Sequence, residues 1–156
     1  ALFAIDTDKN DAVTSLLTAW GKPYFAAWTT TPWTLGSNTA LCVGPKIDYV
    51  AVRTYNPYNG EKITVVMAEA RINAYLAPEG KITDGEELPE YNKGDKFVPY
   101  KVIAHYKGTD LEGMKYKQLM PWVKPSAKVD ENAADFIKVY AEAHPEKVFD
   151  GENGKD

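Results

Sequence analysis

The chain contains one cysteine, Cys42, and only two histidines, His105 and His144, among its 156 residues. A single cysteine cannot form an intramolecular disulfide or a zinc site built on several thiolates, so the composition is typical of a reducing compartment. The two histidines lie far apart and have no neighbouring ligand pattern, which favours structural or solvated roles. Because Cys42 lies in an apolar stretch, we expect its thiol to be buried rather than nucleophilic.

Long hydrophobic runs and an excess of positive charge are also missing. No apolar stretch approaches the roughly 18 residues of a membrane-spanning helix, and the opening ALFAIDTDKND lacks the features of a signal peptide. The formal net charge of −4 is not that of a basic nucleic-acid clamp. We therefore expect a cytoplasmic protein without membrane or DNA partners. Because the chain starts on a strand-like ALFAID and not on Met, we also expect it to be cut from something longer.

Several catalytic motifs are absent as well. The sequence has no G-x-x-x-x-G-K-[ST] phosphate loop, no G-x-G-x-x-G and no G-x-S-x-G nucleophile elbow. Asp110 and Glu112 are candidates for an acid–base pair of carboxylates, but the flanking Gly108 and Gly113 favour a turn with unusual backbone angles. Hydrolysis by a side-chain nucleophile is not indicated.

Hydrophobic periodicity predicts a β-dominated α+β domain, a partly closed barrel with helical decoration. The clearest element is a hairpin, in which DYVAVRTY (48–55) alternates between two faces, Asn59-Gly60 makes the turn, and EKITVVMA (61–68) returns. Further strands are expected over 2–5, 24–30, 39–43 and 96–108, the last broken or bulged at Pro99, and helices over 9–22, 69–77 and 131–143.

The most distinctive stretch is WTTTPWTLGSNTALCVGP, residues 28–45, which crowds hydroxyls between two tryptophans. A turn at Pro32 projects hydroxyls and backbone amides into one small volume, where they can hold an ester carbonyl, a sugar hydroxyl or a water without contributing charge. The alternative is structural: threonine and tryptophan both favour strands, and the stretch is then a strand that ends at a proline turn. Trp28 fits the core as well as it fits a pocket.

The same stretch closely resembles the threonine-rich motif W-T-T-T-P-W-T-L-P-x-N-x-A of the editing domain inserted in bacterial-type isoleucyl-tRNA synthetases. GTDLEGMKYKQLMPW, Gly108 to Trp122, is similar to the G-x-x-L-E-G-x-x-Y-x-P-L-F segment of that family. The valyl and leucyl enzymes differ at the positions of Thr31 and Trp33. The resemblance is looser over 1–22 and 77–94. It implies that residues 1–156 are a single editing-domain fragment of the six-stranded β-barrel type, with peripheral helices and incomplete at its C-terminal side, whose threonine-rich motif spans 28–38.

The resemblance also implies an activity, the hydrolysis of the ester that joins mischarged valine to isoleucine tRNA. Thr29, Thr30 and Thr31 are expected to line the editing pocket, Trp33 to shape it near the terminal nucleotide, and Asn38 to orient the substrate or support the loop. A held water would attack the ester, with assistance from the ribose hydroxyl. The editing domain needs no metal or cofactor, while the parent synthetase would use ATP and Mg²⁺. The expected partners are the acceptor end of isoleucine tRNA carrying valine and the rest of the parent synthetase.

Two departures from the family pattern bear on activity. Gly36 stands where the family has proline, which loosens the turn that presents Asn38. The family's G-T-G-h-h-H-x-A-P and G-x-x-D motif, whose aspartate anchors the amino group of the misplaced amino acid, is expected beyond Asp156. We therefore expect the catalytic aspartate to lie outside this chain and the chain alone to show weak or no hydrolysis. A noncatalytic module that binds single-stranded RNA or carbohydrate through its aromatic residues remains the alternative.

Overall fold

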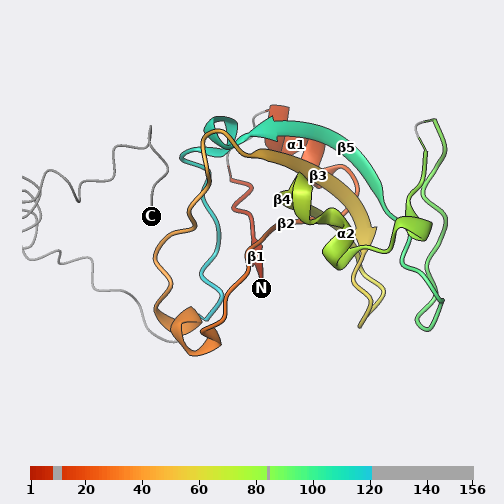
Figure 1. Ribbon diagram of the computed structural model, residues 1–156, viewed down its shortest axis with the longest axis horizontal. Coiled ribbons are helices and arrows are strands. Elements are labelled where there is room, and N and C mark those ends of the chain that lie inside the picture. Colours follow the sequence, from red (N-terminus) through yellow and green to blue (C-terminus); the bar gives the residue numbers. More distant parts are fainter. Residues whose placement is uncertain (9–11, 84, 121–156) are drawn as a thin grey trace, which may run out of the picture.

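A computed structural model of the chain describes residues 1–8, 12–83 and 85–120. Five strands of this part form one mixed sheet in the order β1-β2-β4-β3-β5 (Figure 1). β2 and β4 are parallel, and the other neighbouring strands are antiparallel. The elements are β1 (Leu2–Ala4), α1 (Ala12–Thr18), β2 (Lys22–Ala26), η1 (Pro32–Ser37), β3 (Asp48–Tyr55), β4 (Lys62–Ala68), η2 (Glu69–Arg71), α2 (Ile72–Tyr75), η3 (Pro78–Gly80), β5 (Lys101–Lys107) and η4 (Gly108–Leu111), where η marks a 3-10 helix.

The side chains of β3 alternate between two hydrophobic clusters, one on each face of the sheet. Val50 and Val52 lie on the face that α2 covers, whereas Tyr49 and Ala51 lie on the face that α1 and η4 cover. The predicted alternation is therefore confirmed. Coverage of both faces explains why β4 is a nearly continuous apolar strand, with Ile63–Met67 buried.

The predicted hairpin between β3 and β4 is also confirmed. The Asn56 N–H donates to the Glu61 carbonyl at 2.8 Å, and the Gly60 N–H donates to the Asn56 carbonyl at 2.8 Å. Gly60 has φ 74°, and no non-glycine residue of the described chain has a positive φ, so the glycine alone supplies the left-handed angle that this turn requires.

β2 is shorter and earlier than the predicted strand over 24–30. It starts at Lys22 and ends at Ala26, because its ladders end there: Ala26 pairs with Leu2 of β1, and Phe25 is the last residue paired with β4. Beyond Ala26 the chain has no neighbouring strand among the described residues, so the three threonines do not alternate across a sheet as a continued strand would require.

The strand predicted over 39–43 is wrong. The structure has no strand there, and Cys42, expected to be buried, is exposed. The apolar composition favours a strand, but none of the strands in the described part of the chain lies beside this segment to share hydrogen bonds with it. Its ends are held instead by side chains, because Asn38 donates to the Ala40 carbonyl at 3.0 Å and the Gly44 N–H donates to the Tyr49 hydroxyl at 3.0 Å.

β5 and the helices are shorter than predicted. β5 begins only at Lys101, after Pro99, and its register with β3 shifts between Ala51 and Val52 rather than at the proline. The helix predicted over 69–77 is a 3-10 turn followed by the short α2, and the one predicted over 9–22 is described as α1. The helix expected at 131–143 and His144 lie outside the described residues.

After η4 the chain crosses to the opposite edge of the sheet and lies beside β1. Ile5 pairs with Tyr116, the Asp6 N–H donates to the Lys115 carbonyl at 2.9 Å, and the Lys117 N–H donates to the Ala4 carbonyl at 2.7 Å. In the described part of the chain no ladder joins this edge to β5. The sheet is therefore open, which agrees with a β-dominated α+β domain, while the closed barrel is not confirmed.

Candidate functional site

The threonine-rich segment is a loop at one end of the sheet, next to the start of the chain. The Ala1 amino group donates to the Ala27 carbonyl at 2.8 Å, and the Ala27 N–H donates to the Ala1 carbonyl at 3.0 Å. Pro32 then opens η1, where its fixed φ suits the first helical position and its missing N–H is not needed. In Figure 1 this orange loop and the cyan segment 112–120 lie at the same end of the sheet, opposite the green loop 81–100.

The hydroxyl groups of three threonines form a chain within this loop. The Thr29 hydroxyl accepts the Thr31 N–H at 3.0 Å and lies 3.3 Å from the Thr31 hydroxyl, which in turn lies 3.3 Å from the Thr34 hydroxyl. Thr34 donates from its hydroxyl to the Thr31 carbonyl at 2.7 Å and from its N–H to the same carbonyl at 3.0 Å. The three side chains therefore fix the turn at Pro32 in the absence of any charge.

Thr30 differs from its neighbours. Its side chain is exposed, and its hydroxyl has no hydrogen-bond partner among the described contacts. Trp28 and Trp33 on either side of the threonines are 76% and 78% exposed. Trp28 is thus not a core residue. Two indole faces and one uncommitted hydroxyl are presented to solvent at the same loop.

A pocket of about 180 Å³ lies beneath the loop. Two of the predicted residues, Thr29 and Asn38, line it, together with Thr34 and with apolar side chains from β1 and from the loop. Thr30, Thr31 and Trp33 do not line it. The full lining is Phe3, Ala27, Trp28, Thr29, Thr34, Leu35, Asn38 and Leu41.

Asn38 closes the segment and contacts the later motif. Its Nδ2 donates to the Ala40 carbonyl at 3.0 Å, and its Oδ1 accepts the hydroxyl of Tyr116. Burial raises the pKa of the Tyr116 phenol above its usual value, so this hydroxyl remains a donor through the neutral range. The two segments that carry the family resemblance therefore meet at this hydrogen bond.

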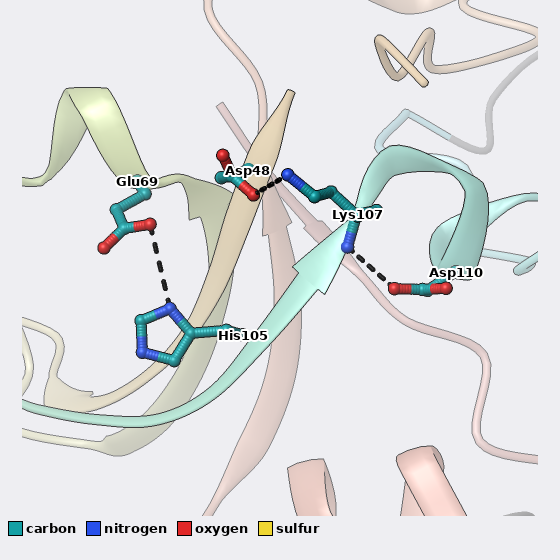
Figure 2. Close-up of polar contacts among 5 residues, drawn as sticks. All are labelled: Asp48, Glu69, His105, Lys107 and Asp110. Atoms are coloured by element: carbon teal, nitrogen blue, oxygen red, sulfur yellow. Dashed lines mark hydrogen bonds and ion pairs between the residues drawn. The ribbon is translucent and has the colours of Figure 1, made fainter. Parts of the chain in front are cut away.

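Among the described residues, none with an ionisable side chain lines this pocket. Asp110, a candidate for acid–base chemistry, instead accepts the Lys107 N–H at 2.7 Å with its carboxylate and so caps η4 (Figure 2). Lys107 also reaches Asp48 with its ammonium group. These contacts confirm the turn interpretation.

The glycines of that turn have two different roles. Gly113 has φ 74°, as expected for a turn glycine. Gly108 does not have a positive φ. It is required by space, because a Cβ built on it would lie 2.0 Å from the Gly44 carbonyl oxygen.

The histidine of β5 lies at the surface beside one carboxylate. The Nδ1 of His105 lies 3.7 Å from the Glu69 carboxylate, and the two side chains are 66% and 46% exposed (Figure 2). Among the residues that the structure describes, no cluster of histidine, cysteine, aspartate or glutamate side chains has the geometry to hold a metal ion. The described helices also include none that is long and apolar enough to cross a bilayer.

Sequence reasoning missed two residues of the site. Tyr116 belongs to the second motif, but the family pattern predicts no role for it. Its distance in sequence from Asn38 gives no sign that the two side chains touch. Phe3 had no signal beyond its place in an apolar strand. Only the pairing of β1 with β2 and of Ile5 with Tyr116 brings Phe3 to the pocket lining and the Tyr116 ring beside Phe3.

Comparison with known proteins finds isoleucine–tRNA ligases. The chain is 66% identical over 106 residues to the isoleucine–tRNA ligase of Bacteroides thetaiotaomicron, which is 68% of the chain and 9% of the relative. The ligase of Porphyromonas gingivalis is 57% identical over 67% of the chain, which is 9% of that ligase. The ligase of Cytophaga hutchinsonii is 48% identical over 73% of the chain, which is 10% of that ligase. No family model and no solved structure matches the chain.

These identities show a domain related to aminoacyl-tRNA synthetases. The chain belongs to the isoleucine–tRNA ligase family and spans about a tenth of the length of the relatives it matches.

Proposed function

We propose that this chain forms part of the site at which an isoleucine–tRNA ligase hydrolyses the ester of valine mischarged to isoleucine tRNA. The observation that carries the proposal is the small uncharged pocket of about 180 Å³, lined by threonine hydroxyls and by Asn38 next to apolar side chains. Two amino acids that differ by one methylene are distinguished by only about 1–3 kcal/mol in one apolar pocket. A second hydrolytic site of restricted size therefore corrects errors that the first site makes.

The chemistry fits a site without a side-chain nucleophile. A water oxygen attacks the ester carbonyl carbon, the bond to the ribose oxygen breaks, and that oxygen takes up a proton, which releases valine and the tRNA. The loop contributes position and neutral hydrogen-bond groups, since Thr30 is exposed and Thr29 and Thr34 are held by their neighbours. Because no acid or base lines the pocket, the ribose hydroxyl of the substrate is the group available to assist.

The proposal includes partners and a setting. The substrate is the acceptor end of isoleucine tRNA carrying valine, and the rest of a cytoplasmic ligase supplies the tRNA-binding surface. We assign the ATP and Mg²⁺ of aminoacylation to the part of the ligase that this chain does not span. Thr31 acts through the turn that it holds, and Trp33 offers an exposed ring to the terminal nucleotide.

The central test is Thr30→Val in the ligase that contains this sequence, because Thr30 does not line the pocket itself but keeps an exposed hydroxyl for the substrate next to Thr29, which does. Valine keeps the shape of threonine but removes the hydroxyl, so we expect hydrolysis of valyl-tRNA to slow about two- to tenfold, as the loss of one hydrogen bond predicts. Aminoacylation with isoleucine should remain near normal. Release of valine from mischarged tRNA is the measurement.

Thr83→Val is the matched control, because Thr83 is exposed in the distant loop 81–100 and its hydroxyl bonds only the nearby Glu86 carboxylate, at 2.8 Å. An equal rate in the two variants would contradict the proposal. The purified chain alone is expected to hydrolyse valyl-tRNA slowly, because it spans about a tenth of the ligases it matches and we assign the tRNA-binding surface to the rest of the ligase.

A noncatalytic module for single-stranded RNA or carbohydrate is the second candidate, and the exposure of Trp28 and Trp33 favours it. Such a module binds uncharged oligonucleotides or glycans without regard to an aminoacyl group. Quenching of tryptophan fluorescence by these ligands, combined with normal hydrolysis by the Thr30→Val ligase, would select it over editing.

A further inference from the structure

Tyr116, near the later end of the described chain, is anchored to the beginning of the chain. Its backbone pairs with Ile5, and the residues on either side of it make the hydrogen bonds to β1 described above. Its ring meets the ring of Phe3 edge to face, with centroids 5.2 Å apart and planes at 77°. Such edge-to-face pairs add attraction beyond area burial. The phenol therefore points from a fixed platform, and its hydroxyl reaches Asn38.

The carboxamide of Asn38 is engaged at both ends. Its oxygen accepts the Tyr116 hydroxyl, and its nitrogen donates to the Ala40 carbonyl at 3.0 Å. Turning the carboxamide around would place its oxygen against the Ala40 carbonyl oxygen, where neither atom has a proton to donate. Asn38 is thus locked in one orientation, and the exit of η1 is locked with it, since the Asn38 N–H also donates to the Leu35 carbonyl.

Both partners of Tyr116 belong to the pocket. Phe3 and Asn38 line it, while Tyr116 itself does not. The sequence places Gly36 in η1, so this turn lacks the stiffness that a proline would give it. The hydrogen bond from Tyr116, which lies outside the loop, therefore restricts the loop to one conformation.

We propose that Tyr116 is a positioning residue for the pocket: its hydroxyl holds Asn38, and Asn38 acts by fixing the threonine-rich loop rather than by binding the substrate. The effect on rate rests on the proposed editing function. The hydrogen bond from Tyr116 to Asn38, which we call the clamp, is a property of the chain itself. A loop that is fixed before the substrate arrives avoids the cost of ordering it during the reaction.

Tyr116→Phe in the ligase tests the rate effect, because it keeps the ring against Phe3 and removes only the hydroxyl. We expect kcat for hydrolysis of valyl-tRNA to fall about two- to tenfold with little change in KM, as loss of one hydrogen bond from the loop predicts. Asn38→Ala should give a similar loss, and the double variant should lose no more than either single variant.

Tyr55→Phe is the matched control. It removes a buried hydroxyl that donates to the Pro89 carbonyl at 3.1 Å, far from the loop, so it costs similar stability without touching Asn38. Its hydrolysis rate should equal that of the parent. Normal hydrolysis in Tyr116→Phe, with slow hydrolysis in Thr30→Val, overturns the inference and leaves the editing function standing.

A measurement on the purified chain distinguishes a failure of the proposed editing function from a failure of the inference about Tyr116. The side-chain amide protons of Asn38, observed by NMR, should shift and exchange faster with water in Tyr116→Phe and remain unchanged in Tyr55→Phe. If the Thr30→Val ligase hydrolyses normally but the Asn38 signals respond in this way, the editing function fails and the clamp stands. Unchanged Asn38 signals in Tyr116→Phe overturn the clamp.

Discussion

The threonine hydroxyls of the loop differ in whether they are hydrogen-bonded within the protein. Those of Thr29, Thr31 and Thr34 satisfy one another and the backbone, whereas that of Thr30 faces solvent. The sequence predicted that hydroxyls gather at Pro32, because the residue types and the proline are local. It did not predict which hydroxyls are already engaged, because that depends on the φ and ψ angles of a turn that no spacing rule specifies.

Gly36 is a residue at which stability can be gained. Its φ is not in the left-handed region, and a Cβ built on it lies no closer than 3.9 Å to another residue, at the Met120 sulfur. Gly36→Ala should therefore raise the free energy of unfolding by about 0.4–1 kcal/mol, because alanine lowers the entropy of the unfolded chain.

The comparison variant for Gly36 is Gly60→Ala. That glycine also has open space around it but has φ 74°, so alanine there should destabilise by roughly 1 kcal/mol. Urea unfolding of the two variants measures both effects. Destabilisation by Gly36→Ala equal to that by Gly60→Ala would show that the turn requires glycine.

At the scale of elements, prediction succeeded where a segment had partners on both sides and failed where it had none. β3 and β4 were placed almost to the residue, because a strict alternation and an adjacent turn specify a hairpin locally. Residues 39–43 have a similar composition, but no strand that the structure describes lies beside them. Strand formation depends on a pairing partner that is distant in sequence, and composition does not reveal it.

α1 offers a direct test of how an element is held to the sheet. Leu17 is fully buried against Ile5 and Val66, whereas the adjacent Leu16 is 37% exposed. Leu17→Ala should reduce the free energy of unfolding by about 2–5 kcal/mol through lost burial and the cavity that remains. Leu16→Ala makes the same chemical change on the outer side and should cost about 1 kcal/mol or less.

Chemical denaturation monitored by circular dichroism compares the two leucine variants. A similar loss of stability in both would mean that α1 does not pack against the sheet through Leu17.

At the scale of the whole molecule, buried phenols make stability depend on alkaline pH. Burial raises the pKa of Tyr55, Tyr100, Tyr106 and Tyr116 above the usual 10.0, and the nearby carboxylates of Glu90, Glu79 and Asp110 raise the first three further. The unfolded chain loses these protons first. The contribution of these phenols to the free energy of unfolding is therefore complete below their pKa in the unfolded chain. It is lost as the pH rises through their higher pKa in the folded chain.

We accordingly expect the midpoint of thermal unfolding to fall steadily above about pH 10, where free phenols ionise. Tyr55→Phe removes one of the contributing groups and should make the decline shallower. A midpoint that stays level while the near-ultraviolet absorbance of phenolate rises would contradict the expectation.

The pairing of Ile5 with Tyr116 has a consequence for how the protein is made. β1 and β2 are synthesised early. The segment around Tyr116, which pairs next to the outer side of β1, is synthesised only after the β3–β4 hairpin, β5 and η4. The parallel pairing of β2 with β4 likewise waits for the hairpin. Contacts between such distant segments require large loops to close, which slows folding. Among the described residues, the hydrogen bond from Tyr116 to Asn38 of the threonine-rich loop can therefore form only after η4 has been synthesised.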